Sequence, residues 1–544
     1  MSTEEKQDYS AAVEASVDHQ SDVQITTLSE VTPKLVKPWF TYRHIALLNF
    51  LLLGSLLAQV VCGYDGSMMN GLQAVPTWNE FFNNPSGAVL GTMSNGTSIG
   101  ALVMMPFVSY IIDYLGRRWS VILGCVIICI GAALQGGANS FGMFVGGRVL
   151  LGLGGAISLT AAPPLVTECA YPTQRPVVTA LLMPSWPLGA LVAALVTWGT
   201  YNGPLVVSNW SWRIPSLLQL ALPLVQIFIA FFGPESPRWL IDKGRHQEAE
   251  EFFTKYHAAG DKNHPIVAYE MAEISATIEE EKAQSVGSWV QWFKGKTMIH
   301  RLFLCIAVPL MQQLSGNALI SFYLPIILKN AGITNADDQL RINLGLSAWT
   351  LVCSIVGAYI VGVFRRRTLF LTGYASMFVV YIVFTIVSAI NAPYVVPGSP
   401  PNKPLSSSIV FLIFLYNMVY QICSPIAFTY VMEICPYSMR SKGSMLYQFA
   451  GAIVGFFNNY ANPIAMEVIT WKYYIVYCVW LVVQFGIVWF LFPETYGRDL
   501  EEVNQAFNDN LVSGREAMEK AHLTINVNVE KGGVLATEKG SEAV

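Results

Sequence analysis

Glu168-Cys-Ala-Tyr-Pro-Thr-Gln-Arg175 places a carboxylate and an arginine seven residues apart, directly after a long apolar run. The same spacing returns in the second half of the chain as Glu433-Ile-Cys-Pro-Tyr-Ser-Met-Arg440, again after an apolar run. A second repeated segment follows each copy, first as Pro234-Glu-Ser-Pro-Arg238 and then as Pro493-Glu-Thr-Tyr-Gly-Arg498. This doubling predicts two copies of one helical unit, each with its charges at the edge of a membrane.

The composition of the chain is that of a membrane protein. Of its 544 residues, 53% are hydrophobic and 12% are charged, which is about half the charged fraction of an ordinary soluble protein. The apolar residues form runs of about 20, the length that crosses a hydrocarbon core ~30 Å thick. Such runs are found at 44–70, 88–112, 119–137, 142–167, 177–201, 213–233, 300–328, 340–364, 369–390, 408–434, 443–466 and 472–492. The sequence therefore predicts an all-α membrane protein with twelve transmembrane helices in two six-helix halves.

The two halves are predicted to be separated by a polar linker and flanked by polar tails. The expected divisions are a disordered cytoplasmic tail at 1–38, a first half at 39–233, a cytoplasmic linker at 234–299, a second half at 300–492 and a cytoplasmic tail at 493–544. In the linker, Ala249, Phe252, Phe253 and Tyr256 follow a helical spacing, which predicts short helices there. Two parallel six-helix halves with a site between them at the midplane are typical of a transporter.

Basic residues of the predicted short loops gather on one side of the membrane, the side that an even number of spans gives to both termini. That side carries Lys34, Lys37, Arg43, Arg117, Arg118, Arg175, Arg365, Arg366, Arg367, Arg440, Lys442 and Arg498. The opposite side carries Arg213, Lys329, Arg341, Lys403 and Lys472. Because short cytoplasmic loops are enriched in lysine and arginine, both termini are predicted to be cytoplasmic, in a multi-pass protein of the cell membrane.

Other classes of function find little support in the sequence. The nine cysteines lie mostly inside predicted spans and form no Cys-x-x-Cys pair, so they are interpreted as packing residues. No phosphate-binding loop, zinc-ligand spacing or nucleophile elbow is present. The chain is therefore predicted to be neither an enzyme nor a metal or nucleic-acid binding protein. We expect a monomer in the lipid bilayer, with no cofactor and a proton gradient as its driving force.

Seven segments together resemble signatures of the sugar porter family of the major facilitator superfamily. They are Gly63-Tyr-Asp-Gly66, Asp113-Tyr-Leu-Gly-Arg-Arg118, Gly147-Arg148, the pair Glu168 and Arg175, Pro234-Glu-Ser-Pro-Arg238, Gln312-Gln-Leu-Ser-Gly316 and Pro493-Glu-Thr-Tyr-Gly-Arg498. The chain is further similar to the fungal lactose-permease and hexose-permease branch, on the segments Lys255–Asp261, Asn263–Pro265, Ser211–Ser216 and Trp471–Ile475. The resemblance implies a major facilitator fold and a secondary active transporter that imports a sugar, a hexose or disaccharide, together with protons.

The charges at the cytoplasmic ends of the spans are interpreted as gating residues. They are Asp113, Arg117, Arg118, Glu168, Arg175, Glu433 and Arg440. Carboxylates and guanidinium groups pair in two-pronged hydrogen bonds, so a cluster of them between helix ends can latch the inner gate in one state and release it in another. The alternative is that they are only orientation signals and loop caps. Gly362 stands where the second half would need a leading Asp, which predicts an asymmetric gate.

Asp65 and Arg148 are predicted to couple transport to protons. A charge well inside a span costs roughly 2.5–3.5 kcal/mol on insertion scales, so such a residue is rarely there without a partner or a use. Both residues lie at similar depths below the outer loops. The family resemblance implies that Asp65 is the protonation site and that Arg148 is its partner. The alternative is a static structural ion pair.

The substrate site is predicted on the seventh span and its neighbours. Sugars are bound by amide and hydroxyl side chains, with aromatic rings against their C–H faces. The candidates are Gln312, Gln313, Asn317 and Tyr323 on span seven, Phe428 on span ten and Met183 on span five. Met183 and Phe428 stand where the family carries an amide and a tryptophan, and Ala318 and Gly451 stand where it carries amides.

These substitutions leave alternatives to sugar import open. A less polar or bulkier cargo, such as an organic acid or a secondary metabolite, is the first alternative, and it could move outward. A nutrient sensor that does not transport is the second. Only about 50 residues follow the last predicted span, which disfavours a sensor with a long signalling tail.

Overall fold

The protein is described by a computed structural model of the whole chain. The structure describes residue 32 and residues 37–204, 206–284, 289–394, 402–435 and 439–496, without the side chains at 176, 180, 183, 280–284, 440 and 441. The predicted disorder of the two tails falls almost wholly outside these residues.

Nine helices lie in the described part of the first half. They are α3 (Arg43–Ala74), α4 (Pro76–Phe81), α5 (Gly87–Leu115), α6 (Arg117–Gly136), α7 (Phe141–Cys169), α8 (Arg175–Ala180), α9 (Leu182–Tyr201), α10 (Trp210–Leu218) and α11 (Ala221–Phe232), preceded by the 3-10 turn η1 (Trp39–Thr41). Within this half α6 packs along α7, α5 along α7 and α3 along α9. The sixth predicted span is thus made of two helices, α10 and α11, which meet at Gln219 and Leu220.

The linker and the second half follow the same plan. The described linker contains α12 (Pro237–Asp242), α13 (His246–Tyr256), α14 (Pro265–Gln284) and η2 (Trp289–Phe293). The second half contains α15 (Lys296–Gln313), α16 (Asn317–Asn330), α17 (Ala336–Val363), α18 (Arg366–Asn391), η3 (Ala392–Tyr394), α19 (Lys403–Ile434), α20 (Arg440–Val468), η5 (Thr470–Lys472) and α21 (Tyr473–Leu491). Here the seventh predicted span is the divided one, because α15 ends at Gln313 and α16 begins at Asn317.

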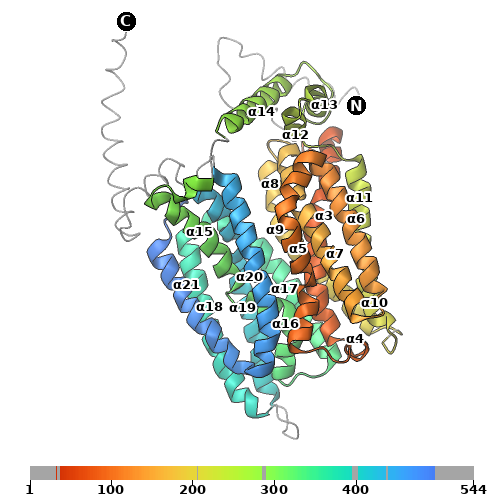
Figure 1. Cartoon of the computed structure of the whole chain (residues 1–544), viewed down its shortest axis with the longest axis vertical. Coiled ribbons are helices and arrows are strands. Elements are labelled where there is room, and N and C mark those ends of the chain that lie inside the picture. Colours follow the sequence, from red (N-terminus) through yellow and green to blue (C-terminus); the bar gives the residue numbers. More distant parts are fainter. Residues whose placement is uncertain are drawn as a thin grey trace.

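The predicted class, an all-helical membrane protein of two halves, is confirmed. Eleven spans in the described chain are long and apolar enough to cross a membrane, with pairs of consecutive helices counted as one. The twelfth span, α20, has 29 residues but carries Asn458, Asn459 and Asn462, which lower its hydropathy. Figure 1 shows the two groups of helices side by side. Across their boundary α5 packs against α20, α9 against α17, and α3 against α16.

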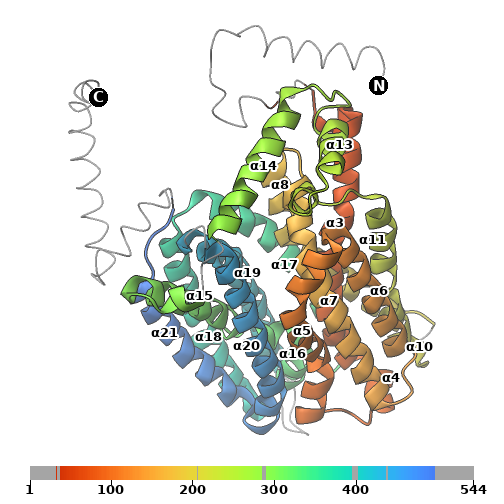
Figure 2. The same ribbon diagram turned by 45° about the horizontal axis from the view of Figure 1, so that its top comes forward.

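The linker helices pack on the first half of the molecule. Figures 1 and 2 both show α12, α13 and α14 at one end of that half, near the start of α3. Phe252, Phe253 and Tyr256 of α13 join Leu48 of α3 and Leu165 of α7 in one buried apolar cluster. The helical spacing seen in the linker sequence therefore corresponds to a face that docks on the membrane helices.

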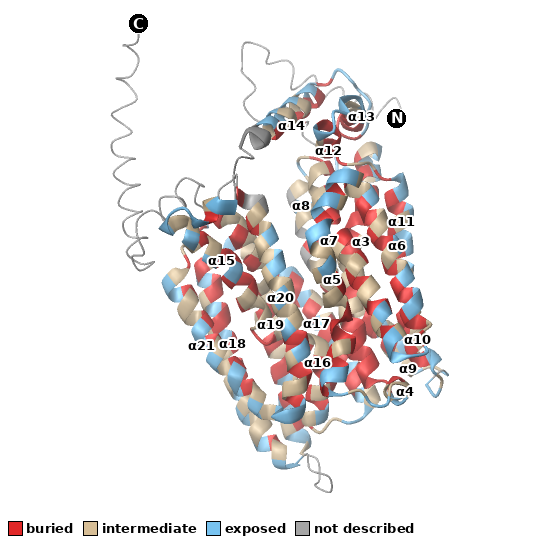
Figure 3. Ribbon diagram, in the orientation of Figure 1, coloured by how far each residue is buried: buried red, intermediate tan, exposed pale blue. Residues whose placement is uncertain are grey.

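Apolar side chains cover the outside of the helix bundle. Phe107, Phe228, Val352 and Phe490 are all more than half exposed. Figure 3 shows exposed and intermediate residues along the outer helix faces, and buried residues between the helices. A soluble protein does not expose apolar side chains along whole helices, so these faces are the ones that contact lipid.

Candidate functional site

Asp65 and Arg148 form an ion pair inside the first half. Arg148 Nη1 lies 3.3 Å from Asp65 Oδ1, and the side chains of Arg148 and Asp65 are 3% and 18% exposed, respectively. The other arm of the guanidinium, Nη2, lies 3.5 Å from the Ser94 carbonyl and 3.5 Å from Thr97 Oγ1. The structure thus brings together the two residues that were predicted to couple transport to protons, one from α3 and one from α7.

A third residue, Gln219, also forms a hydrogen bond with Asp65 of this ion pair. Gln219 Nε2 donates to Asp65 Oδ1 at 2.9 Å, a shorter contact than the one from Arg148. The break between α10 and α11 places this side chain beside α3, where it is 5% exposed. Gln219 Oε1 is buried and has no hydrogen-bond partner among the described residues. The sequence analysis did not single out Gln219, although an amide within an apolar span is the signal that could have found it.

Two aromatic rings approach α3 at the residue after Asp65. A methyl group at Gly66 would lie 3.2 Å from Trp186 Cζ2 and 3.6 Å from Phe322 Cε1. The absence of a side chain at Gly66 therefore lets one ring of each half reach α3. Trp186 was also missed. Its position in the middle of a span, rather than at the membrane interface that tryptophan prefers, is the signal that could have found it.

The break in the seventh span exposes backbone carbonyl groups that side chains satisfy. Tyr416 and Tyr381 donate to the carbonyls of Ser315 and Gly316 at 2.9 and 3.1 Å. Asn458 Nδ2 donates to the Gln313 carbonyl at 2.7 Å. Non-helical backbone at membrane depth persists only where it is satisfied in this way. Gly316 itself has φ of +101°, a conformation that favours glycine.

Gln312 lies at the centre of a polar cluster formed by three helices. Its Nε2 donates to Ser424 Oγ at 2.9 Å, and the Tyr447 hydroxyl donates to its Oε1. The ring of Phe428 lies edge-on to that of Tyr447, with 5.4 Å between the ring centroids. α15, α19 and α20 thus present an amide, two hydroxyl groups and an aromatic pair in one place. Ser424 and Tyr447 were not predicted.

The other predicted substrate residues have different surroundings. Gln313 is half-buried, and its side chain faces Gly455 of α20. A Cβ added to Gly455 would lie 4.0 Å from the Gln313 Cδ atom. No side-chain hydrogen bond of Gln313 is found in the described part of the chain. Asn317 Oδ1 accepts from Ser321 Oγ at 3.2 Å. Met183 is in α9, but its side chain lies outside the described residues.

Tyr323 and the asparagines of α20 form hydrogen bonds with other residues of the protein. Tyr323 is fully buried, and its hydroxyl donates to the Asn459 carbonyl. Asn458 and Asn462 accept from Tyr477 at 3.2 and 2.7 Å. Tyr323 is buried in this conformation, and its predicted contact with a substrate stays a prediction. The Oδ1 atoms of Asn458 and Asn462 are occupied by a tyrosine of α21, whereas Asn462 Nδ2 has no partner among the described residues.

The outer ends of the two halves are joined by hydrogen bonds. Asn70 Nδ2 donates to the Ser321 carbonyl at 2.5 Å, and Asn70 Oδ1 accepts from the Leu324 N–H at 3.1 Å. Gln73 Nε2 donates to the Phe322 carbonyl at 2.9 Å. Further contacts join Asn95 to Phe456, Ser86 to Glu467, and Trp198 and Asn202 to Asp337. These hydrogen bonds hold the two halves together at the end of the bundle opposite the linker.

At the other end of the first half, a carboxylate holds the start of α6. Glu235 Oε1 accepts from the backbone N–H groups of Arg117 and Arg118 at 2.9 and 3.0 Å. These are the free donors at a helix N-terminus, where a carboxylate is favourable. Burial raises the pKa of Glu235 above its ordinary value, although these N–H groups oppose the shift. The repeated Pro-Glu segment therefore caps a helix.

The predicted gating residues of the first half gather around this cap. Glu168 Oε2 lies 3.5 Å from Arg117 Nε and accepts from the Ser236 hydroxyl. Asp113 Oδ1 lies 3.8 Å from Arg117 Nη1. Glu168 is thus paired with Arg117 and not with Arg175, which begins α8. Arg118 donates to the Phe231 carbonyl.

The second half repeats the helix cap and the arginine–glutamate pair of this arrangement. Glu494 accepts from the N–H groups of Arg366 and Arg367 at 2.9 and 3.2 Å, at the start of α18. Arg366 Nη2 lies 3.0 Å from Glu433 Oε1, and Thr495 Oγ1 donates to Glu433 Oε2 at 2.5 Å. Arg366 pairs with Glu433 without a leading Asp, whereas Arg117 also contacts Asp113, for which Gly362 offers no counterpart; the asymmetric gate stays a prediction. Arg440 begins α20, and its side chain lies outside the described residues.

Comparisons with known proteins identify the family to which the sequence is similar. A sequence model of the family described as "Sugar (and other) transporter" matches residues 51–507. The low-affinity glucose transporter HXT1 of Saccharomyces cerevisiae is 28% identical over 435 residues, 79% of this chain and 74% of that protein. The MFS-type transporter oryC of Aspergillus oryzae is 28% identical over 461 residues, 82% and 83% of the two chains.

Solved structures show the same fold. The inward open conformation of the xylose transporter XylE from E. coli superposes with a TM-score of 0.69 at 18% identity, covering 84% of this chain and 99% of that one. Another XylE structure names that protein a proton:xylose symporter. The sequence resemblance to the sugar porters and to fungal hexose transporters is thus confirmed, and the chain belongs to the sugar (and other) transporter family of the major facilitator fold.

Proposed function

We propose that this protein imports a sugar across the cell membrane together with protons, by alternating access between its two halves. The observation that carries the proposal is Asp65 inside the first half, held by the buried Arg148 at 3.3 Å and by Gln219 at 2.9 Å. Similar proteins named as glucose transporters and a proton:xylose symporter support the choice of sugar and proton.

The coupling follows from the surroundings of Asp65. Proton binding neutralises the carboxylate and leaves the buried Arg148 without its counter-ion. A buried charge without a partner is strongly unfavourable, so protonation and the arrangement of α3 and α7 are linked. The Oε1 atom of Gln219 is buried without a partner among the described residues, and it offers an acceptor close to the protonated acid. Proton binding thereby favours one arrangement of the first half over another.

The sugar is proposed to bind where the break of span seven faces the first half. The Gln313 amide makes no side-chain hydrogen bond among the described residues, whereas the Gln312 amide is fixed by Ser424 and Tyr447. Gln313 thus supplies the direct contact, and Gln312 holds the aromatic pair of Phe428 and Tyr447. Trp186 and Phe322, which lie against Gly66, offer the ring faces that a sugar needs.

The decisive experiment is uptake of labelled glucose, galactose, xylose, lactose and cellobiose in a transport-deficient host, with and without a protonophore. Accumulation of at least one sugar against its gradient, abolished by the protonophore, is expected. Asp65→Asn should allow only equilibration, because the amide cannot take up the proton. An Asp65→Asn variant that still concentrates the sugar would contradict the proposed proton coupling.

A second candidate function is transport of a non-sugar molecule, such as an organic acid or a secondary metabolite. Ala318, which stands where the sugar porters carry an amide, is 4% exposed and apolar. Among the relatives are proteins named only as MFS-type transporters. Failure of every sugar in the uptake panel would favour this candidate. Met183→Gln and Ala318→Asn should strengthen sugar uptake if sugar is the cargo.

The orientation, location and assembly of the protein are proposed from the charges. The clusters of Glu235 and Glu494 lie at the end of the bundle that also carries the linker, and basic loops favour the cytoplasm. These charges support our proposal that both termini lie in the cytoplasm, and we further propose that the protein acts as a monomer at the cell surface. Antibodies against terminal epitope tags should bind only after permeabilisation of intact cells, and binding before it would contradict this orientation.

A further inference from the structure

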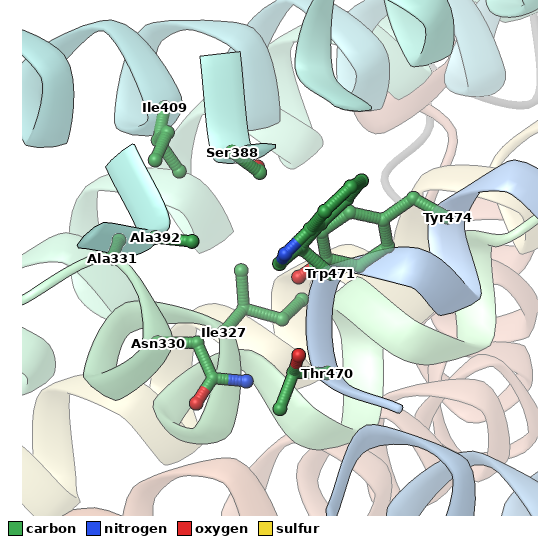
Figure 4. A pocket seen from close by; sticks show the side chains of 9 residues that line it. All are labelled: Ile327, Asn330, Ala331, Ser388, Ala392, Ile409, Thr470, Trp471 and Tyr474. Carbon is green, nitrogen blue, oxygen red and sulfur yellow. The ribbon is translucent and has the colours of Figure 1, made fainter. Parts of the chain in front are cut away.

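A cavity of about 220 Å³ lies in the second half, at the end opposite the linker. Its walls come from four places in the chain, namely the end of α16, the end of α18 with η3, the start of α19, and η5 with the start of α21. Figure 4 shows the side chains around it. None of them belongs to the cluster of Gln312 or to that of Asp65, so this cavity is separate from the transport site.

Several polar groups of the cavity lack partners. The Asn330 Nδ2 atom is buried and has no hydrogen-bond partner among the described residues. In Figure 4 the indole nitrogen of Trp471 and the hydroxyl of Tyr474 point into the same space. Neither side chain makes a hydrogen bond within the described part of the chain. A buried donor without an acceptor is unfavourable by ~1–3 kcal/mol, and a ligand that brings acceptors removes this penalty.

Hydrogen bonds between helices hold the walls of the cavity in place. The Ala331 carbonyl, which follows α16, accepts from Asn391 Nδ2 at 3.1 Å and from Ser406 Oγ at 2.6 Å. These bonds hold the end of α16 against α18 and α19. Thr470 has φ of +46°, which is uncommon for a β-branched residue. Such backbone strain gathers at ligand sites, where surrounding structure maintains it.

The lining identifies the class of ligand. It contains the aromatic side chains Trp471 and Tyr474, the amide of Asn330 and the hydroxyls of Ser388 and Thr470, and no charged side chain. Aromatic faces beside hydrogen-bonding groups suit the C–H and O–H groups of a sugar. The volume is roughly seven times the ~30 Å³ that a water molecule occupies in the liquid. This volume accommodates one sugar ring.

We propose that this cavity is a second binding site, open to the outside, for a single neutral sugar ring. Its choice of sugar and its opening to the outside rest on the proposed function and orientation; it needs neither transport nor proton coupling. The site includes the end of α16, the helix that Asn70 contacts at Ser321. A sugar that bridges Asn330 and Trp471 therefore also holds α16 in its present place.

The test is protection of a cysteine placed in the cavity. Ser388→Cys is expressed in intact cells and labelled from outside with a charged, membrane-impermeant methanethiosulfonate, with D-glucose or D-xylose present or replaced by KCl of equal osmolarity. The parent protein with its nine native cysteines gives the background. The labelling rate of the introduced thiol should fall as the site fills, about twofold when the sugar concentration equals its Kd.

Two further variants separate this site from the transport site. Protection should persist when Gln313→Ala is added to Ser388→Cys, and it should be lost when Trp471→Leu is added. Trp210→Leu, at an exposed tryptophan outside the cavity, is the matched control and should leave protection unchanged. Should Trp471→Leu fail to reach the surface, Asn330→Leu and Trp471→Phe test the same site with smaller changes.

The outcomes are distinct for the two proposals. Sugar uptake without any protection of the introduced thiol, or protection that disappears with Gln313→Ala, overturns the second site and leaves the proposed function intact. Protection by sugar in a protein that transports none of the tested sugars supports the second site and contradicts the proposed function.

Discussion

Asn70 occupies the gap that Pro325 leaves in the backbone hydrogen bonds of α16. A proline has no N–H, so the Ser321 carbonyl, four residues earlier, has no helical donor. Asn70 Nδ2 donates to this carbonyl at 2.5 Å, and Asn70 Oδ1 accepts from the Leu324 N–H at 3.1 Å. A side chain of the first half thus completes a helix of the second half.

The first prediction concerns this contact. Asn70→Ala removes hydrogen bonds between the halves, and each is worth about 0.5–1.5 kcal/mol. The contacts between the halves at this end should therefore be destabilised by about 1–3 kcal/mol, and outside labelling of a cysteine introduced in place of Ser321 should accelerate. Asn79→Ala is the matched control, because Asn79 bonds only to Gln73 and Val75 within its own half. Equal labelling rates in the Asn70 and Asn79 variants would contradict the prediction.

The second prediction concerns Gln219. Its amide donates to the charged form of Asp65, and a hydrogen bond to a charged form favours that form. Gln219→Leu should therefore make protonation easier and move the midpoint of the pH profile of uptake to higher pH. Gln226→Leu, which removes another buried amide with its partner Ser158, serves as the control. A profile that shifts equally in both variants would indicate a general effect on packing.

The third prediction concerns the cap of α6. Because burial raises the pKa of Glu235 above 4.5, its contribution to stability is present at low pH and is lost as pH rises through the raised pKa. Glu235→Gln does not titrate. The melting temperature of Glu235→Gln relative to wild type should therefore increase from about pH 4.5 upwards, measured on detergent-purified protein. A difference that does not change with pH would show that the carboxyl does not titrate in this range.

The fourth prediction tests the equivalence of the two charged clusters. Arg117 and Arg366 hold the same position in the two halves, each paired with a glutamate and each at the start of a helix. Arg117→Ala and Arg366→Ala should both destabilise the protein by about 1–3 kcal/mol, the value of hydrogen bonds to charged groups, and both should slow uptake. Thermal unfolding and initial uptake rates measure this. A harmless Arg366→Ala beside a damaging Arg117→Ala would contradict the equivalence and support the asymmetric gate.

Much of the fold could be read from the sequence because the membrane restricts what a chain can do. Twelve apolar runs of sufficient length predict twelve spans, and the basic loops between them predict one orientation. The Glu168 and Glu433 segments identified the two halves because their apolar surroundings make charges conspicuous. Asp65 and Arg148 were found for the same reason, because a charged side chain inside a span is unfavourable unless an opposite charge lies at the same depth.

The contacts between helices could not be read in this way. Gln219 reaches Asp65 only because the sixth span breaks at that residue, and a break is not visible in an apolar run. Arg366 pairs with Glu433 at 3.0 Å because α18 and α19 pack side by side, and spacing along the chain does not show this contact. The contacts of Asn458 and Asn462 with Tyr477 of α21 likewise depend on helix packing.

The sequence by itself determined the class of protein, the two halves, the charged ends and the buried ion pair, since each of these follows from the cost of placing polar groups in lipid. Only the tertiary structure decided which groups meet. In the tertiary structure Asn70 donates to the carbonyl that Pro325 leaves without a helical donor, and Gln219 donates to Asp65. Glu235 and Glu494 accept from the N–H groups at the starts of two helices. The physical reason is that hydrogen bonds act over about 3 Å, and distances of that size between distant segments are set by helix packing.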